Sequence, residues 1–317
     1  MIKVDLITGF LGAGKTIFIR EYAKYLIGNG EKITIIENDY GAVNIDMVLL
    51  QDLLGEKCNL EMIVGGDGKE AHRRRLRTKL ISMGMSGYTR VIVEPSGIYD
   101  ADEFFDILYD EPLDRWYEIG SVISIVDAQT TLLLEGTMKY LFMSETAWAG
   151  KLVLSKTDEQ TNATKIVEFI NETMKEYGCS ARFDTEKDVM AKPYDRMGNP
   201  DFESLKNAGY RKSSYAKKII GDNQFSPLFY FDVEMDKAIL VSTVEKLLSD
   251  EKAGRVIRVK GFVKTGENEQ LQINATGNET RLDPVASSRN VIIIIGERLN
   301  KEYINEIMRP YCSVVSL

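Results

Sequence analysis

The sequence is poor in the residues that bind zinc or form disulfides. It has one histidine, His72, and three cysteines, Cys58, Cys179 and Cys312, which lie far apart along the chain. A structural zinc site is recognised by closely spaced Cys and His ligands, and a disulfide framework needs paired cysteines, so the sequence predicts neither. Dispersed thiols are typical of a reducing compartment, and we expect a cytoplasmic protein.

Long apolar runs and an excess of basic charge are also missing. No stretch approaches the roughly 18 consecutive apolar residues that a membrane-spanning helix needs, and the N-terminal MIKVDLITGF lacks the apolar core of a signal peptide. The 40 Lys and Arg residues are outnumbered by 48 Asp and Glu residues. The resulting net charge of −8 repels phosphate polymers and anionic membranes, so we expect neither nucleic acid nor membrane as a partner.

What is present indicates a soluble globular protein of two domains, with 317 residues, 44% of them hydrophobic and 28% charged. Short β-branched runs alternate with amphipathic segments, which predicts parallel strands joined by crossover helices. The predicted strands are 4–8, 33–37, 60–64, 91–95, 121–126 and 151–155. The clearest helical periods are 17–30 and 165–178, each ending at a glycine.

A change in composition predicts the domain boundary. Residues 186–224 are polar and interrupted by prolines, which favours an irregular connection at the end of a first domain, 1–224. The second domain, 225–317, shows the order βαβββα. Its predicted strands are 229–234, 255–263, 269–276 and 290–296, and its predicted helices are 242–250 and 300–308. We therefore expect an α/β domain with a mainly parallel sheet, followed by a small α+β domain with helices on one face of a mostly antiparallel sheet.

Residues 9–16 read GFLGAGKT and fit G-x-x-x-x-G-K-[ST] between a predicted strand and a predicted helix. Glycines in such a loop let backbone N–H groups point inward toward an anion, and the helix N-terminus adds partial positive charge. Lys15 is predicted to reach the β- and γ-phosphates of a nucleotide as a catalytic residue, and Thr16 to bind Mg²⁺. The predicted phosphate-binding set is Gly9, Gly12, Ala13, Gly14, Lys15 and Thr16.

Two other strand ends carry a carboxylate and a glycine. Asp39 follows the strand 33–37, and Glu94 and Gly97 lie at the end of the strand 91–95. Ligands gather at the carboxyl edge of open α/β sheets. Asp39 and Glu94 are therefore predicted to hold Mg²⁺ or its waters and to act in catalysis, and the Gly97 N–H to contact the γ-phosphate. Each stretch taken alone reads equally well as an acidic turn.

The sequence Ser155-Lys156-Thr157-Asp158 follows the last predicted strand of this series. A carboxylate here can accept from both the ring N–H and the exocyclic amino group of guanine, which adenine cannot match. Asp158 is therefore predicted to select guanine, with Lys156 along the plane of the base and Ser155 beside it. The alternative is an ordinary surface turn.

Together the segments TGFLGAGKT, ENDYGAVNID, EPSG, SIVDA and SKTD resemble, in this order, the CobW-like branch of the P-loop GTPases. The second-domain segments GRVIRVKGFV and NVIIIIGERLNKEYINEIM resemble the C-terminal domain of that branch. The resemblance implies Mg²⁺-dependent GTP hydrolysis used as a conformational switch that assists a metallo- or cofactor-dependent client protein. It also implies a homodimer.

Two alternatives to this function stay open. Many members of the branch deliver Zn²⁺, Co²⁺ or Ni²⁺, so the chain can be read as a nucleotide-gated metal carrier. A P-loop alone does not separate a GTPase from an ATP-using NTPase or a small-molecule kinase.

The chain departs from the family's motifs at three places. Ser155 stands where relatives have an asparagine that contacts the base and ties the loops together, and Ala42 replaces a second acid. Where relatives carry Gly-Cys-x-Cys-Cys, this chain has GGDGK at 65–69, without the thiols. Oxygen and nitrogen ligands for a harder metal remain nearby in Asp67, Glu70 and His72, although a polar turn is the favoured interpretation.

The run 72–79 contains four arginines and a lysine. These residues would spread around a helix, which indicates a solvated helix paired with acidic neighbours. The alternatives are a docking patch for an acidic partner, or an arginine near the γ-phosphate.

Overall fold

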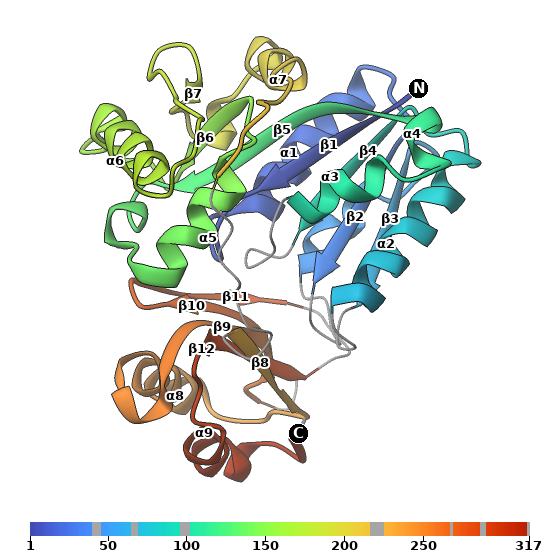
Figure 1. The fold of residues 1–317 in the computed structure, drawn as a ribbon. Helices are drawn as coiled ribbons and strands as arrows, with labels where there is room; N and C mark the ends of the chain where they lie inside the picture. The colour runs from blue at the N-terminus through green and yellow to red at the C-terminus, as the bar shows by residue number, and fades with distance from the viewer. Residues whose placement is uncertain are drawn as a thin grey trace. The chain divides into compact units, whose positions relative to one another are not determined.

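The computed structural model describes residues 1–39, 46–64, 69–95, 102–215, 225–266, 269–285 and 290–315. Within these ranges it describes only the backbone of Asn38, Asp39, Asp46, Val64, Lys69, Glu70, His72, Asp102, Glu103, Phe225, Ser226, Val314 and Val315. The chain divides into two compact units, Met1–Lys218 and Ile219–Leu317. Figure 1 shows the elements of each unit. None of the described helices is long and apolar enough to span a membrane.

The first unit is built on a seven-stranded sheet in the order β3-β2-β4-β1-β5-β6-β7 (Figure 1). Its strands are β1 (Ile2–Thr8), β2 (Ile33–Asp39), β3 (Cys58–Val64), β4 (Arg90–Pro95), β5 (Tyr117–Asp127), β6 (Lys151–Ser155) and β7 (Val189–Met190). All of its strand pairings are parallel, which confirms the predicted α/β sheet.

Helices cover both faces of this sheet. They are α1 (Lys15–Gly28), α2 (Lys69–Gly84), α3 (Asp102–Leu108), α4 (Leu113–Trp116), α5 (Gly136–Thr146), α6 (Ala163–Glu176) and α7 (Asn199–Lys206). Phe18 and Tyr22 of α1 pack with Phe202 of α7 in one apolar cluster on the sheet. The crossovers from β1 to β2 and from β2 to β3 run toward one edge of the sheet, and those from β3 to β4 and from β4 to β5 run toward the other. The right-handed rule therefore places α1 on one face and α2 and α3 on the opposite face (Figure 1).

Each of the two predicted helices of this unit begins two residues earlier than its apolar period indicated. The first starts inside the glycine loop at Lys15, because Lys15 and Thr16 form the first turn of α1. The second is capped by Asn162, whose side chain accepts from the Lys165 N–H.

The prediction of an irregular connection over 186–224 was wrong for its first part. This stretch contains β7, the 3₁₀ turn η3 (Tyr194–Arg196) and helix α7. Pro200 lies in the first turn of α7, where a proline needs no N–H partner and does not interrupt the helix. Phe202 and Leu205, three residues apart, are buried in the apolar cluster of the first unit.

The second unit is a six-stranded antiparallel sheet in the order β11-β10-β9-β12-β8-β13. Its elements are β8 (Phe225–Phe231), α8 (Lys237–Ser249), β9 (Arg255–Lys264), β10 (Gln270–Thr276), β11 (Glu279–Pro284), β12 (Val291–Glu297), α9 (Lys301–Met308) and β13 (Val314–Val315). Leu240 of α8 and Ile304 of α9 share one core with the sheet, which confirms the α+β prediction. The edge strands β11 and β13 were not predicted, since β11 is mostly polar and exposed.

The remaining helical segments are short 3₁₀ turns. They are η1 (Asp46–Leu53), η2 (Thr131–Leu133), η4 (Glu251–Ala253) and η5 (Arg309–Tyr311).

Candidate nucleotide site

The loop between β1 and α1 is held in conformations that favour glycine. Gly9, Gly12 and Gly14 have φ angles of +139°, +78° and +90°. A Cβ at Gly9 would also overlap the carbonyl oxygen of Ile125 on β5. Gly14 is the N-cap of α1, no side chain caps this end, and the first turn contains no acidic residue. The N–H groups at the start of α1 therefore suit an anionic ligand.

A buried carboxylate anchors the start of this loop. The Gly9 N–H donates to Glu145 Oε2 at 2.8 Å, and the Thr8 hydroxyl donates to the Glu145 carbonyl oxygen at 2.7 Å. Glu145 lies on α5 and is completely buried. Glu145 was not among the predicted site residues, although a lone glutamate in the mostly apolar helix GTMKYLFMSET is a detectable anomaly.

Three of the predicted phosphate and metal residues lie together at the carboxyl edge of the sheet. The Thr16 hydroxyl donates to Glu94 Oε2 at 3.0 Å, and Lys15 Nζ lies 3.9 Å from Glu94 Oε1. Lys15 also donates to the Gly9 carbonyl oxygen at 2.8 Å, which curls the loop around its ammonium group. All three side chains are less than one tenth exposed. The site thus combines a cation, a hydroxyl and a carboxylate in a sheltered place.

The neighbouring strand contributes a second carboxylate. Glu37 of β2 is opposite Glu94 of β4 in the parallel register, and it is 3% exposed. Glu37 was not among the predicted site residues. The predicted Asp39 ends β2, but its side chain lies outside the described residues, as do Ala42 and Gly97.

The predicted base-reading loop begins at the end of β6. Lys156 has a φ of +51°, and its Nζ forms an ion pair with Asp127 Oδ2 at 2.9 Å. Asp127 ends β5, and its other oxygen accepts from the N–H groups of Gln129 and Thr130 at 2.9 and 3.2 Å. Asp127 therefore fixes the orientation of Lys156. Asp127 lies in the SIVDA segment, but this role was not predicted from the sequence.

Asp158 is held by its own loop. Its Oδ1 accepts from the Gln160 N–H at 3.0 Å and from the Thr161 hydroxyl at 2.9 Å. The Asp158 N–H donates in turn to the Thr161 hydroxyl oxygen at 2.8 Å. This reciprocal pair orients an exposed carboxylate before any ligand arrives.

The described residues contain no cluster of three or more His, Cys, Asp or Glu side chains that could hold a metal ion. The sequence-predicted second-metal candidates fall outside this statement, because Asp67 and the side chains of Glu70 and His72 are not described. Burial raises the pKa of the Cys58 thiol to about 11, which keeps it protonated at neutral pH.

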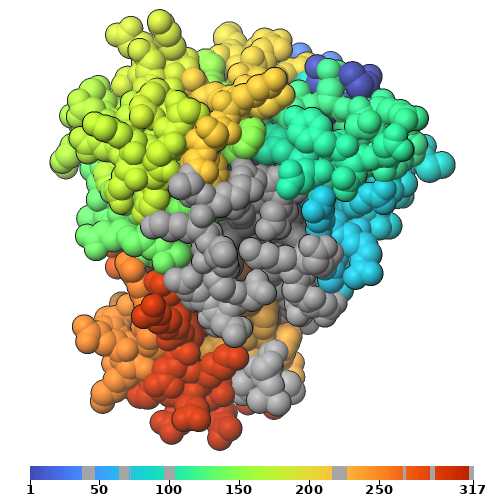
Figure 2. Space-filling view, in the orientation of Figure 1, coloured from blue at the N-terminus to red at the C-terminus, as the bar shows by residue number. Residues whose placement is uncertain are grey.

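The basic helix α2 pairs with acidic and carbonyl groups. Arg73 lies 3.4 Å from Asp110 and Lys79 lies 2.5 Å from Glu61, while Arg77 donates to the carbonyl oxygen of Glu111. In Figure 2 the side chains of α2 lie at the surface (cyan). The observed pairs agree with the prediction of a solvated helix.

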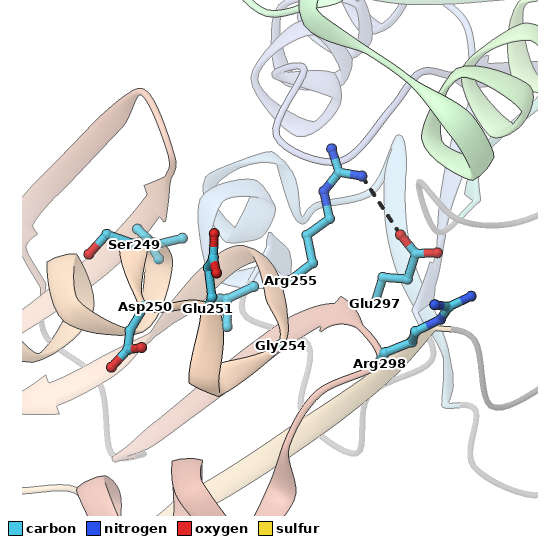
Figure 3. Close-up of a pocket in the computed structure, with 9 residues that line it drawn as sticks. Ser249, Asp250, Glu251, Gly254, Arg255, Glu297 and Arg298 are labelled. Atoms are coloured by element: carbon cyan, nitrogen blue, oxygen red, sulfur yellow. Dashed lines mark ion pairs between the residues drawn. The ribbon is translucent and has the colours of Figure 1, made fainter.

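A separate hollow lies within the second unit, between the end of α8 and the start of β9 (Figure 3). It is lined by charges of both signs, and Arg255 forms an ion pair with Glu297 at 3.8 Å. These opposite charges offset each other, so the hollow has no single charge preference.

A parallel sheet of this strand order, with a glycine loop leading into α1 and a buried Lys-Thr-Glu group beside it, defines a P-loop nucleotide-binding protein. The chain belongs to the CobW/HypB/UreG nucleotide-binding domain family, whose model matches residues 3–183. Residues 227–310 match the cobalamin synthesis protein cobW C-terminal domain. The family resemblance expected from the sequence is therefore confirmed for both units.

The individual relatives differ from this chain at most of their aligned positions. The chain is 25% identical over 282 residues to the zinc chaperone YjiA of Escherichia coli K12, covering 83% of this chain and 81% of the relative. It is 28% identical over 162 residues to the zinc chaperone YeiR of the same organism, covering 51% and 48%. A solved structure of the Zn(II)-bound YjiA GTPase from E. coli is 23% identical with a TM-score of 0.41, covering 98% of this chain and 99% of that one.

Proposed function

We propose that the chain binds and hydrolyses GTP with Mg²⁺ and uses the nucleotide state as a switch that assists a metallo- or cofactor-dependent client protein. The observation that carries the proposal is the group formed by Lys15, Thr16 and Glu94 at the start of α1. The expected cytoplasmic location and the implied homodimer stay predictions.

The oxygen ligands beside the P-loop fit Mg²⁺. Mg²⁺ prefers hard oxygen ligands at about 2.1 Å in an octahedron, and adjacent ligands are then about 3.0 Å apart. The Thr16 hydroxyl and the nearer oxygen of Glu94 are 3.0 Å apart. Thr16 and Glu94 would therefore hold the ion, directly or through water, and the ion would neutralise phosphate charge.

The chain's own groups would position the reacting phosphate. Lys15 would exchange its contact with the Gly9 carbonyl oxygen for contacts with the β- and γ-phosphate oxygens. Glu145 keeps the first glycine of the loop in place through its bond to the Gly9 N–H. Such chemistry is positioning and charge stabilisation, so no covalent nucleophile is required.

The choice of guanine would rest on Asp158. We expect Asp158→Asn to weaken GTP binding on the order of 10- to 100-fold, because a hydrogen bond to a charged group contributes about 1.5–3 kcal/mol. Xanthine has a carbonyl oxygen in place of the 2-amino group, and the new amide can donate to it. The variant should therefore prefer XTP to GTP in calorimetric titrations.

The matched control for this change is Glu159→Gln, an exposed neighbour in the same loop that loses the same charge. It should leave the affinities for GTP, ATP and XTP unchanged. Equal binding of GTP and ATP by the unaltered chain would favour the ATP-using NTPase or the small-molecule kinase instead.

The role of a transition metal is tested separately. Two relatives are called zinc chaperones, but the chain has GGDGK where the family's thiols stand. Since soft thiolate ligands are absent there, we expect micromolar Zn²⁺ or Co²⁺ to leave the GTP affinity measured with Mg²⁺ unchanged. A metal-dependent shift in GTP affinity would restore the nucleotide-gated metal carrier, and substitution of Asp67 or His72 should then abolish the shift.

A further inference from the structure

Tyr194 carries a buried hydroxyl that the sequence analysis did not select. The residue begins η3, four positions after the edge strand β7. Its Oη is shielded from solvent and makes no hydrogen bond of good geometry with the residues the structure describes, although the Ser155 side chain lies close enough to influence it. Buried polar groups in folded proteins are nearly always paired, so an unpaired hydroxyl indicates either strain or a missing ligand.

The position of this hydroxyl connects it to the nucleotide site. A Cβ built on Gly14 would lie 3.7 Å from Tyr194 Oη and 4.0 Å from Ser155 Cβ. The phenol, the last glycine of the P-loop and the first residue of the base loop therefore meet at one point. The Tyr194 ring packs edge-on against Phe18 of α1, with 5.7 Å between ring centroids.

The electrostatic surroundings keep the phenol protonated. Burial raises the pKa of Tyr194, a hydrogen-bonding interaction with the Ser155 side chain lowers it, and the charges of Asp127 and Glu94 raise it further. Ser155 itself donates to the Val126 carbonyl oxygen at 3.3 Å. The neutral phenol is thus a hydrogen-bond donor enclosed by the P-loop and the base loop.

We propose that the Tyr194 hydroxyl donates a hydrogen bond to the N7/O6 edge of the purine ring of the bound nucleotide. This inference rests on the proposed function, which puts guanine in the 155–158 loop. With Asp158 taking the N1–H and the amino group of guanine, the edge that remains carries two acceptors, N7 and O6. Ser155 is shorter than the asparagine of the family's motif, and the Tyr194 hydroxyl, from a different element, lies beside it.

The test uses Tyr194→Phe, which keeps the ring against Phe18 and removes only the hydroxyl. Two measurements on the full chain should move in opposite directions. The melting temperature of the nucleotide-free protein should stay unchanged or rise, because an unpaired buried hydroxyl is removed. The affinity for GDP, measured by calorimetry, should fall on the order of tenfold.

A second ligand identifies the acceptor. Wild type and variant are titrated with 7-deaza-GDP, which has C–H in place of N7. If N7 is the acceptor, wild type loses affinity for this analogue and the variant loses nothing more. If O6 is the acceptor, the variant binds both GDP and 7-deaza-GDP more weakly than wild type, by the same factor.

The control is Tyr117→Phe. Tyr117 is buried in the same unit, but its hydroxyl donates to the Leu80 carbonyl oxygen at 2.6 Å. This change should lower the melting temperature and leave GDP affinity unaltered. The proposal is overturned if Tyr194→Phe binds GDP as tightly as wild type, which would leave Tyr194 a packing residue. Failure of the wild-type protein to bind GDP would instead contradict the proposed function.

Discussion

Replacing Lys15 by alanine should lower the rate of GTP hydrolysis by at least about 10²- to 10³-fold, to the point where turnover is not measurable. Lys15 is the buried cation of the P-loop, and it lies 3.9 Å from Glu94 and 2.8 Å from the Gly9 carbonyl oxygen. Its removal takes away the charge that would meet the β- and γ-phosphates. Phosphate release under single-turnover conditions measures the rate.

Lys24→Ala is the matched control for this experiment. Lys24 lies on the same helix, α1, but at the surface, where it pairs with Glu21 at 2.8 Å. The Lys24→Ala variant should hydrolyse GTP at the wild-type rate. Circular dichroism checks that the Lys15 variant is folded, and a folded Lys15→Ala protein with wild-type turnover would remove the assignment of the P-loop as the catalytic site.

Replacing Arg90 by alanine should destabilise the first unit by about 3–5 kcal/mol. Arg90 Nη1 donates to both carboxylate oxygens of Asp5 at 2.6 Å, and Asp5 also accepts from Tyr22 and from the Ser121 N–H, each at 2.8 Å. Asp5 is completely buried and Arg90 is 4% exposed. Loss of the guanidinium leaves an uncompensated charge inside the sheet. Urea unfolding measures the change in the free energy of unfolding.

The loss of unfolding free energy caused by Arg90→Ala should depend on pH. Burial raises the pKa of Asp5, while Arg90 lowers it through its charge and hydrogen bond. Without Arg90 the folded-state pKa rises further above the unfolded value, so the contribution of Asp5 to stability is lost as pH increases. The deficit of Arg90→Ala should therefore be smaller at pH 5 than at pH 8. An equal deficit at both values would contradict the role given to Asp5.

The exposed pair Lys3–Glu118 provides the control for the buried pair. Its two ends are 3.0 Å apart, but both side chains are at least one third exposed. Water and salt screen such a pair, so Lys3→Ala should change the free energy of unfolding by no more than about 1 kcal/mol.

Much of the fold could be predicted because most of its strands and helices have a recognisable pattern within a short stretch of sequence. The six strands of the first unit from β1 to β6 were each recognised as β-branched runs, and α1 was predicted directly after the P-loop, although its start was placed two residues too late. Residues 189–206 were misjudged because prolines in a polar stretch were taken as breaks. Pro200 instead lies in the first turn of α7, whose two buried apolar residues are too few to show a period.

The site was predicted only as far as its contiguous motifs reach. Residues 9–16 and 155–158 carry their own chemistry, and the structure puts Thr16 against Glu94 as strand ends predicted. Contacts with Glu145 and Tyr194 have no local pattern, since each joins residues far apart in the chain.

The order of residues alone predicted the two-domain organisation, the parallel sheet and the P-loop, because periodicity and loop motifs are local properties of a polypeptide. The residues that contact the P-loop were decided only by the tertiary structure. A helix that buries Glu145 beneath Gly9, and a turn that brings Tyr194 to Gly14 and Ser155, depend on how distant segments pack. Packing is a property of the assembled core, where a side chain's neighbours are set by the sheet and not by the sequence around it.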